Sequence, residues 1–145
     1  MPQCYFLTVV AGSSVDQQSN NVTLFNLVEQ INLPAGGRLP SGRPIPLEVH
    51  AYLSLEPGEL GLEFEMRVAL VHSATGLETF TEPAKYRPPT ARLRTRVMGL
   101  PCPPSLGHYD VQVDFRLGDD GDWSRDSHKW PISLLEAATK TKVTH

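Results

Sequence analysis

The sequence predicts an all-β protein, an immunoglobulin-like antiparallel β-sandwich of about seven to eight short strands in a single domain. Residues 45–55, 62–70 and 109–117 alternate apolar and polar side chains, a pattern typical of strands that are buried on one face. The 13 Pro and 11 Gly are spread along the whole chain, which short strands with frequent turns tolerate and long helices do not. A length of 145 residues suits one domain with its own core.

Weaker strands are predicted around these three. Residues 22–31 fit two interpretations, because the apolar residues from Leu24 to Ile31 have helical spacing whereas the β-branched residues favour a strand; we predict a strand. Pro131 cannot donate a hydrogen bond within a sheet, so residues 127–134 are expected at a sheet edge. The other weak strands are residues 4–11, 77–81 and 92–99.

Two turns carry residues with a predicted structural role. Gly107 and Tyr109 stand where a Pro- and Gly-rich turn meets a strand, and immunoglobulin-like domains often pin a corner with such a Tyr. The alternative is that Tyr109 is a core aromatic residue with its hydroxyl near the rim. Asp120 and Gly121 lie between two alternating segments and indicate a hairpin turn. We expect residues 1–134 to form the sandwich and residues 135–145 to form a flexible C-terminal tail.

The acidic stretch FRLGDDGDWSRD, residues 115–126, is the most obvious candidate for a metal site. A calcium loop of the EF-hand type needs a Gly at its bend and a Glu at its twelfth position. Counted from Asp120, no Gly stands at the bend and the twelfth position is Pro131. We therefore expect a turn here and predict no metal site.

Arginines at alternate positions form a candidate ligand site. Arg92, Arg94 and Arg96 project from one face of one strand, and Arg87 lies just before them. Such a row can bind carboxylates or phosphates through bidentate hydrogen bonds. The alternative is an ordinary solvated face on which cross-strand acids pair with the arginines. The candidate acids are Glu63, Glu65, Asp110 and Asp114.

The first two predicted strands are apolar on both faces, which a sheet wetted on one side does not require. Either another part of the chain covers the second face or another protein does. We therefore predict an interface for a protein partner or for self-association as a homodimer. Its candidate residues are Tyr5, Leu7, Val9, Phe25 and Leu27.

Three segments carry a resemblance to a known family: NVTLFNLVEQI, LGLEFEMRVALVHSATG and RLRTRVMGLPCPPSLGHYDVQVDF. They resemble a family of short, uncharacterised bacterial proteins that is defined as a domain of unknown function. The resemblance extends from Leu7 to Leu134 and depends on turn residues and core strands. It implies a small β-sandwich in a bacterial cytoplasm and supplies no catalytic residue.

Charge and motifs exclude several functions. A formal charge of −3 argues against electrostatic binding of nucleic acid or of an anionic membrane. No apolar segment reaches the length of a membrane span, and the N-terminus resembles a first strand more than a signal peptide, so we expect a cytoplasmic protein. Cys4 and Cys102 are then expected as free thiols, and a disulfide only if the chain is exported. No nucleotide-binding or nucleophile motif is present, so we predict no cofactor and no catalytic residue.

These observations lead to a ranked set of functions. The first is a non-enzymatic β-sandwich module for protein–protein interaction or assembly. The alternative is a binder of small anions or acidic ligands that uses the arginine-lined face. A metal-dependent hydrolase built on the acidic turn is a third possibility with less support.

Overall fold

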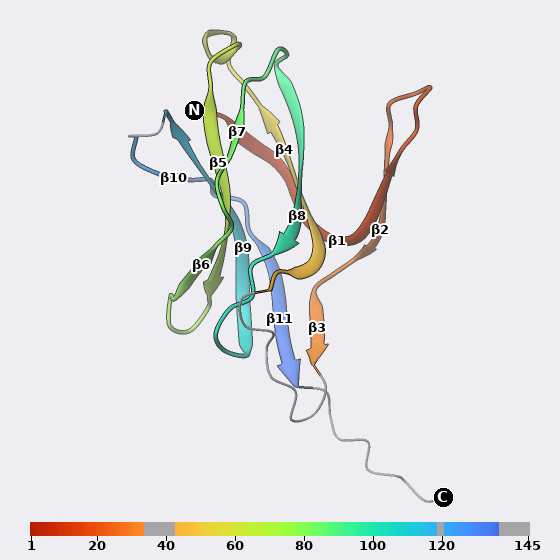
Figure 1. Ribbon diagram of the computed structural model, residues 1–145, viewed down its shortest axis with the longest axis vertical. Helices are drawn as coiled ribbons and strands as arrows, with labels where there is room; N and C mark the ends of the chain where they lie inside the picture. Colours follow the sequence, from red (N-terminus) through yellow and green to blue (C-terminus); the bar gives the residue numbers. More distant parts are fainter. Residues whose placement is uncertain (34–42, 119–120, 137–145) are drawn as a thin grey trace, which may run out of the picture.

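The computed structural model describes residues 1–33, 43–118 and 121–136, and these residues form two packed β-sheets (Figure 1). The prediction of an all-β sandwich is confirmed. One short 3₁₀ helix, Pro57–Glu59, interrupts the strands. Residues 34–42, 119–120 and 137–145 lie outside the described residues, and with them Asp120 and almost all of the predicted tail.

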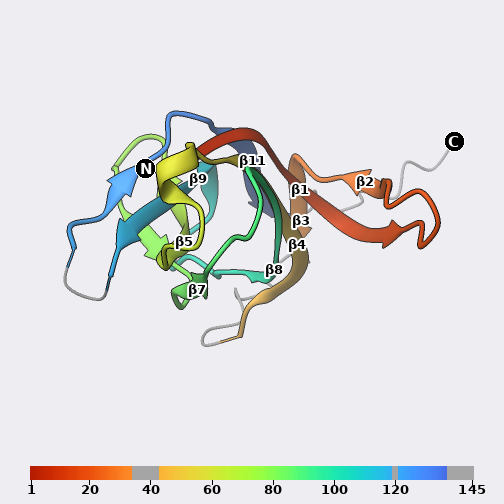
Figure 2. The ribbon, with the colours of Figure 1, turned by 90° about the horizontal axis from the view of Figure 1, so that it is seen from above.

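The first sheet has four antiparallel strands in the order β2-β1-β4-β8. Its edges are therefore β2 and β8. Seen from above, the hairpin of β1 and β2 projects away from the two packed layers (Figure 2). The strands are β1 (Gln3–Val15), β2 (Val22–Leu27), β4 (Ile45–Ser54) and β8 (Arg92–Leu100).

The second sheet has the order β3-β11-β9-β5-β6, with β7 paired to β5 and β10 paired to β9. Its pairs are antiparallel except for β11 and β3, which run parallel. The prediction of a purely antiparallel sandwich is wrong at this pair, because the chain crosses from β2 into the second sheet before β3. The strands are β3 (Gln30–Leu33), β5 (Phe64–His72), β6 (Glu78–Phe80), β7 (Ala84–Tyr86), β9 (Gly107–Leu117), β10 (Ser124–Arg125) and β11 (Trp130–Glu136).

Two local expectations are tested by this topology. The predicted strand over residues 22–31 is confirmed against the helical alternative, but it is divided into two strands, β2 and β3, that are joined by two residues. Strand β11 is not an edge strand, because it lies between β9 and β3. Pro131 is nevertheless tolerated, since β3 pairs with β11 only from Ser133 onward and Pro131 has β9 alone beside it.

The core lies between the two sheets. Apolar side chains of β1, β4, β5, β8, β9 and β11 meet there and are almost completely buried. Burial of a large apolar side chain contributes about 1.5–3 kcal/mol, so this layer supplies most of the stability. The largest members are Phe64, Phe115, Leu53, Met66, Leu70, Leu100, Ile132 and Leu134.

A β-bulge near the start of β1 changes which way its side chains face. Cys4 pairs with Leu53 and Phe6 pairs with Tyr52, so Tyr5 is an extra residue in the pairing. Cys4 and Leu7 consequently face the core, while Tyr5 and Phe6 both remain exposed. Strict alternation between the two faces of the strand therefore does not hold across this point.

The turn before β9 is fastened by Tyr109. Its hydroxyl donates a 2.6 Å hydrogen bond to the backbone oxygen of Ser105, four residues upstream. The ring is buried, and Gly107 between the two adopts a φ of 139°. This is the hydroxyl-to-backbone contact by which a Tyr pins a corner in sandwich domains.

Candidate functional site

Arg92, Arg94 and Arg96 lie on the outer face of β8, opposite Ser54, Tyr52 and His50 of β4. The acids that the sequence offered as their partners belong to the second sheet or to the segment before β5. Glu63 contacts Lys85 and Arg87, and Glu65 pairs with Arg116. Asp110 and Asp114 lie on β9, where Asp114 pairs with Arg67 and Arg125.

Within the described residues, none of the three arginines on β8 forms an ion pair with a carboxylate. Arg94 donates two 2.8 Å hydrogen bonds to Asn20, one to its backbone oxygen and one to its side-chain oxygen. Arg92 lies with its guanidinium carbon 5.9 Å from the centre of the Tyr5 ring. The interpretation of this row as a face neutralised by cross-strand acids is therefore wrong for the acids that were considered.

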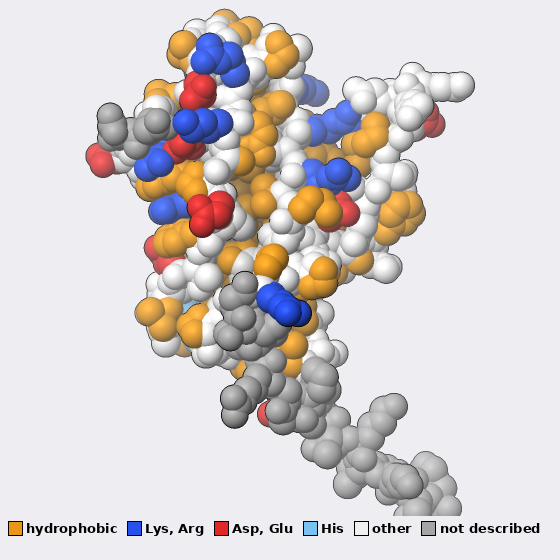
Figure 3. All heavy atoms as spheres, viewed as in Figure 1, with side chains coloured by type: hydrophobic (Ala, Val, Ile, Leu, Met, Phe, Trp, Pro, Cys, Tyr) orange, Lys and Arg blue, Asp and Glu red, His pale blue; other side chains and the backbone are white. Residues whose placement is uncertain are grey.

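The contact between Arg94 and Asn20 places the tip of the β1–β2 hairpin opposite β8. Two adjoining cavities lie between the hairpin and strands β4 and β8, with volumes of about 460 and 240 Å³. Lys or Arg side chains and hydrophobic side chains gather on this surface (Figure 3). We call the two cavities together the arginine groove; its lining residues are Tyr5, Phe6, Ser13, Val15, Asn21, Val22, Leu24, His50, Tyr52, Arg94, Thr95 and Arg96.

Aromatic rings form part of the groove. The Tyr52 ring lies 5.1 Å from the Phe6 ring and 6.1 Å from the Tyr5 ring, measured between centroids. Partial burial raises the pKa of the Tyr52 hydroxyl above its ordinary value. No aromatic residue interleaves Arg92, Arg94 and Arg96 in the sequence, yet in space these rings stand beside them. They come from β1 and β4, which is why the sequence of β8 contains no sign of them.

One acid lies close to the groove. Glu48 accepts a 2.7 Å hydrogen bond from the Ser13 hydroxyl and lies 3.0 Å from Nε2 of His50. These contacts, with the nearby charge of Arg96, hold the pKa of Glu48 below its ordinary value. Because the Glu48 side chain is largely buried and already bonded, it does not occupy the exposed donors of the arginines.

The other predicted site residues are dispersed. Arg87 follows β7 and pairs with Glu63, so it lies outside the groove. Tyr5, Phe25 and Leu27 are 46%, 49% and 58% exposed. Leu7 and Val9, in contrast, are part of the buried core and are not available to a partner of the folded chain. Only Tyr5 of the five predicted interface residues lines the groove.

The outer face of the second sheet carries a separate network of ion pairs. The Asp114 carboxylate accepts hydrogen bonds from the Nε atoms of Arg67 and Arg125, at 2.9 and 2.8 Å. Arg125 also pairs with Glu78. The guanidinium of Arg67 lies 4.3 Å from the centre of the Trp123 ring. Every charge named here has an opposite partner, which distinguishes this face from the arginine groove.

The described residues contain no helix that is long and apolar enough to cross a membrane. Comparison with models of known protein families and with curated proteins finds no match to this chain. The resemblance to short bacterial proteins therefore stays a prediction.

Proposed function

We propose that this chain is a non-enzymatic β-sandwich module for protein–protein interaction, and that the arginine groove binds an extended acidic segment of a partner. One observation carries the proposal: three exposed arginines have no ion pair with a carboxylate among the described residues, and they stand at a groove that contains aromatic rings. Arg94 and Arg96 line the groove, and Arg92 lies beside the Tyr5 ring at its border. A planar guanidinium binds a carboxylate through two parallel hydrogen bonds. Aromatic rings add contact area at a low cost in conformational entropy.

The spacing of the arginines favours an extended peptide. Residues two apart in a strand are separated by about 6.6 Å, so Arg92 to Arg96 spans about 13 Å. Carboxylates at alternate positions of an extended segment have the same repeat. Two of the three guanidinium groups, those of Arg92 and Arg96, have no hydrogen bond to another described residue and are available to such a segment.

A protein segment fits better than a nucleic acid. The whole chain carries a net charge of −3, which repels a polyanion at long range. A short acidic peptide carries few charges and depends mainly on the local field of the three arginines. Aromatic rings beside arginines are also a feature of single-strand binding, so nucleic acid is included as an outcome of the test.

The test uses a fluorescent peptide with Glu at alternate positions and Thr between them. The wild-type chain should bind it in an anisotropy titration, with an affinity that falls as salt rises. Replacing Arg92, Arg94 and Arg96 together by Ser should weaken binding at least about tenfold, which corresponds to about 1.4 kcal/mol. Arg87→Ser is the matched control and should leave the affinity unchanged.

Two results would contradict this function. The first is equal peptide affinity in the wild type and the triple variant. The second is tighter binding of single-stranded oligothymidine than of the Glu peptide. A peptide with Gln in place of Glu should bind weakly, because it presents the same shape without the carboxylates.

A second candidate function is self-association through β2. This strand is an edge of the four-stranded sheet, and Phe25 and Leu27 are the exposed apolar residues on it. An edge strand offers unpaired backbone groups to a second copy, and two-fold symmetric dimers are the commonest oligomers. The sequence had assigned these same residues to an interface.

This candidate predicts a concentration-dependent dimer. Light scattering after size exclusion should show a dimer at micromolar concentration. The double variant Phe25→Glu, Leu27→Lys should shift the equilibrium to monomer by more than about tenfold, because each buried apolar side chain is worth about 1.5–3 kcal/mol. The exposed Leu62→Lys is a control that should not change the mass. A wild-type chain that is monomeric at every concentration excludes the dimer.

A further inference from the structure

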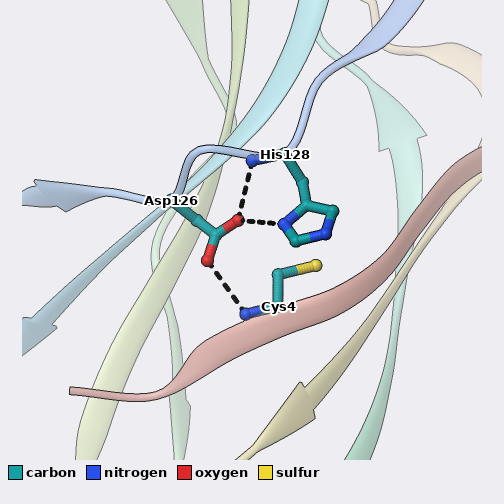
Figure 4. Close-up of side chains that lie close together, drawn as sticks. All are labelled: Cys4, Asp126 and His128. Carbon is teal, nitrogen blue, oxygen red and sulfur yellow. Dashed lines mark hydrogen bonds and ion pairs between the residues drawn. The ribbon is translucent and has the colours of Figure 1, made fainter.

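A second group of chemically functional side chains lies away from the arginine groove. Cys4, Asp126 and His128 each direct one donor atom toward the others, and a sulfur, a carboxylate oxygen and an imidazole nitrogen lie within 4.8 Å of one another (Figure 4). No pair of them is close in the sequence except Asp126 and His128. Cys4 belongs to β1 in the four-stranded sheet, and the other two lie between β10 and β11 of the second sheet.

The local structure explains why these three meet. The bulge at Tyr5 turns the Cys4 side chain inward. Asp126 follows β10, and its backbone nitrogen donates to the oxygen of Val113 on β9, which fixes the segment beside the end of β1. The carboxylate of Asp126 then accepts a 2.9 Å hydrogen bond from the backbone nitrogen of Cys4. It accepts another, also 2.9 Å, from the backbone nitrogen of His128.

We propose that Cys4, Asp126 and His128 form a binding site for Zn²⁺ that joins the two sheets. Thiolate, imidazole and carboxylate are the three ligand types that zinc uses in proteins. Three protein ligands leave one tetrahedral position for water. A thiolate and a carboxylate together carry two negative charges, which balance the charge of the ion.

The backbone hydrogen bonds to Asp126 orient its carboxylate. In metal sites, hydrogen bonds from the surrounding residues orient the ligands in the same way. Nδ1 of His128 lies 2.9 Å from the carboxylate oxygen Oδ1, so an ion must replace this direct contact. The His128 side chain is 45% exposed and can turn without disturbing the core. Arg125 is a cation next to Asp126. Its positive charge is compensated by ion pairs with Asp114 and Glu78, so its repulsion of a bound metal ion is weak.

The same three residue types also occur in cysteine nucleophile sites, but the geometry disfavours that chemistry. The Cys4 thiol donates to the backbone oxygen of Phe6 at 3.1 Å and is largely buried. Burial raises the pKa of Cys4 to about 11, so the thiolate that a nucleophile needs is scarce. A bound metal ion, in contrast, deprotonates a coordinating thiol outright.

Cobalt is a suitable probe because it reports its ligands in an absorption spectrum. Titration of the full, reduced chain with Co²⁺ should give a thiolate-to-cobalt charge-transfer band that saturates at one equivalent and disappears when Zn²⁺ is added. Cys4→Ser should abolish the band. His128→Gln, which changes a half-exposed ring and leaves the core intact, should weaken Co²⁺ binding at least about tenfold.

Cys102→Ser is the matched control, because Cys102 is the second cysteine and lies elsewhere. It should leave the band unchanged. Zn²⁺ should also raise the melting temperature of the wild type and of Cys102→Ser, and it should raise that of His128→Gln by less. The zinc site is excluded if no band forms, or if the band persists in Cys4→Ser. Neither result bears on peptide binding in the arginine groove, which is measured separately.

Discussion

Replacing Asp114 by Ala should lower the free energy of unfolding by about 3 kcal/mol. The Asp114 side chain is only 2% exposed and bridges Arg67 and Arg125. Its removal leaves Arg67 without a carboxylate partner and Arg125 with Glu78 alone, and a partly buried charge without its partner bears its desolvation cost. Both arginines retain some access to water, which keeps the expected loss at the lower end for a broken buried pair.

Urea denaturation followed by tryptophan fluorescence measures this change. Glu63→Ala is the matched control, because it also removes a carboxylate that contacts two cations, Lys85 and Arg87, but on the exposed surface. We expect the control to lose less than about 1 kcal/mol. If both variants lowered the free energy of unfolding by a similar amount, the burial of Asp114 would add nothing to the stabilisation from its ion pairs.

Replacing Gly107 by Ala should cost about 2–3 kcal/mol of stability. Gly107 has a φ of 139°, a conformation that residues with a Cβ atom rarely adopt. A Cβ atom there would lie 2.7 Å from Nε2 of His72. The imidazole cannot move freely, because its Nδ1 accepts hydrogen bonds from the backbone of Ala74 and Thr75 and its ring packs edge-on against Tyr109.

Gly58→Ala is the control for this substitution. Gly58 lies in the short 3₁₀ helix, and a Cβ atom added there would meet nothing within 4 Å beyond its neighbours in the chain. We expect the stability of this variant to change by less than about 0.5 kcal/mol. Thermal unfolding of the two variants separates the effects. A Gly107→Ala variant as stable as Gly58→Ala would mean that the turn before β9 accommodates a side chain.

The sequence predicted those strands whose pattern is local. The segments 45–55, 62–70 and 109–117 correspond to β4, β5 and β9, because alternation over many residues reports a half-buried strand directly. The bulge at Tyr5 and the parallel pairing of β11 with β3 were missed. Both depend on the strand that lies alongside, and a single strand does not encode the identity of its neighbour.

The same limit explains why the sequence predicted the candidate sites only in part. Alternation correctly placed Arg92, Arg94 and Arg96 on one face of β8. It could not show that the acids on β9 belong to the other sheet, nor that rings from β1 and β4 stand beside the arginines. The contact between Cys4 and Asp126 joins residues 122 positions apart, and no spacing motif covers such a distance.

The bulge in β1 places neighbouring residues at two separate surfaces of the protein. Cys4 faces the buried interior beside Asp126, and its immediate neighbours Tyr5 and Phe6 face the arginine groove on the opposite side of the sheet. The proposed zinc site and the arginine groove therefore use consecutive residues of one strand. In a strand without the extra residue, Cys4 and Phe6 would lie on one face, so the bulge is what separates the two sites.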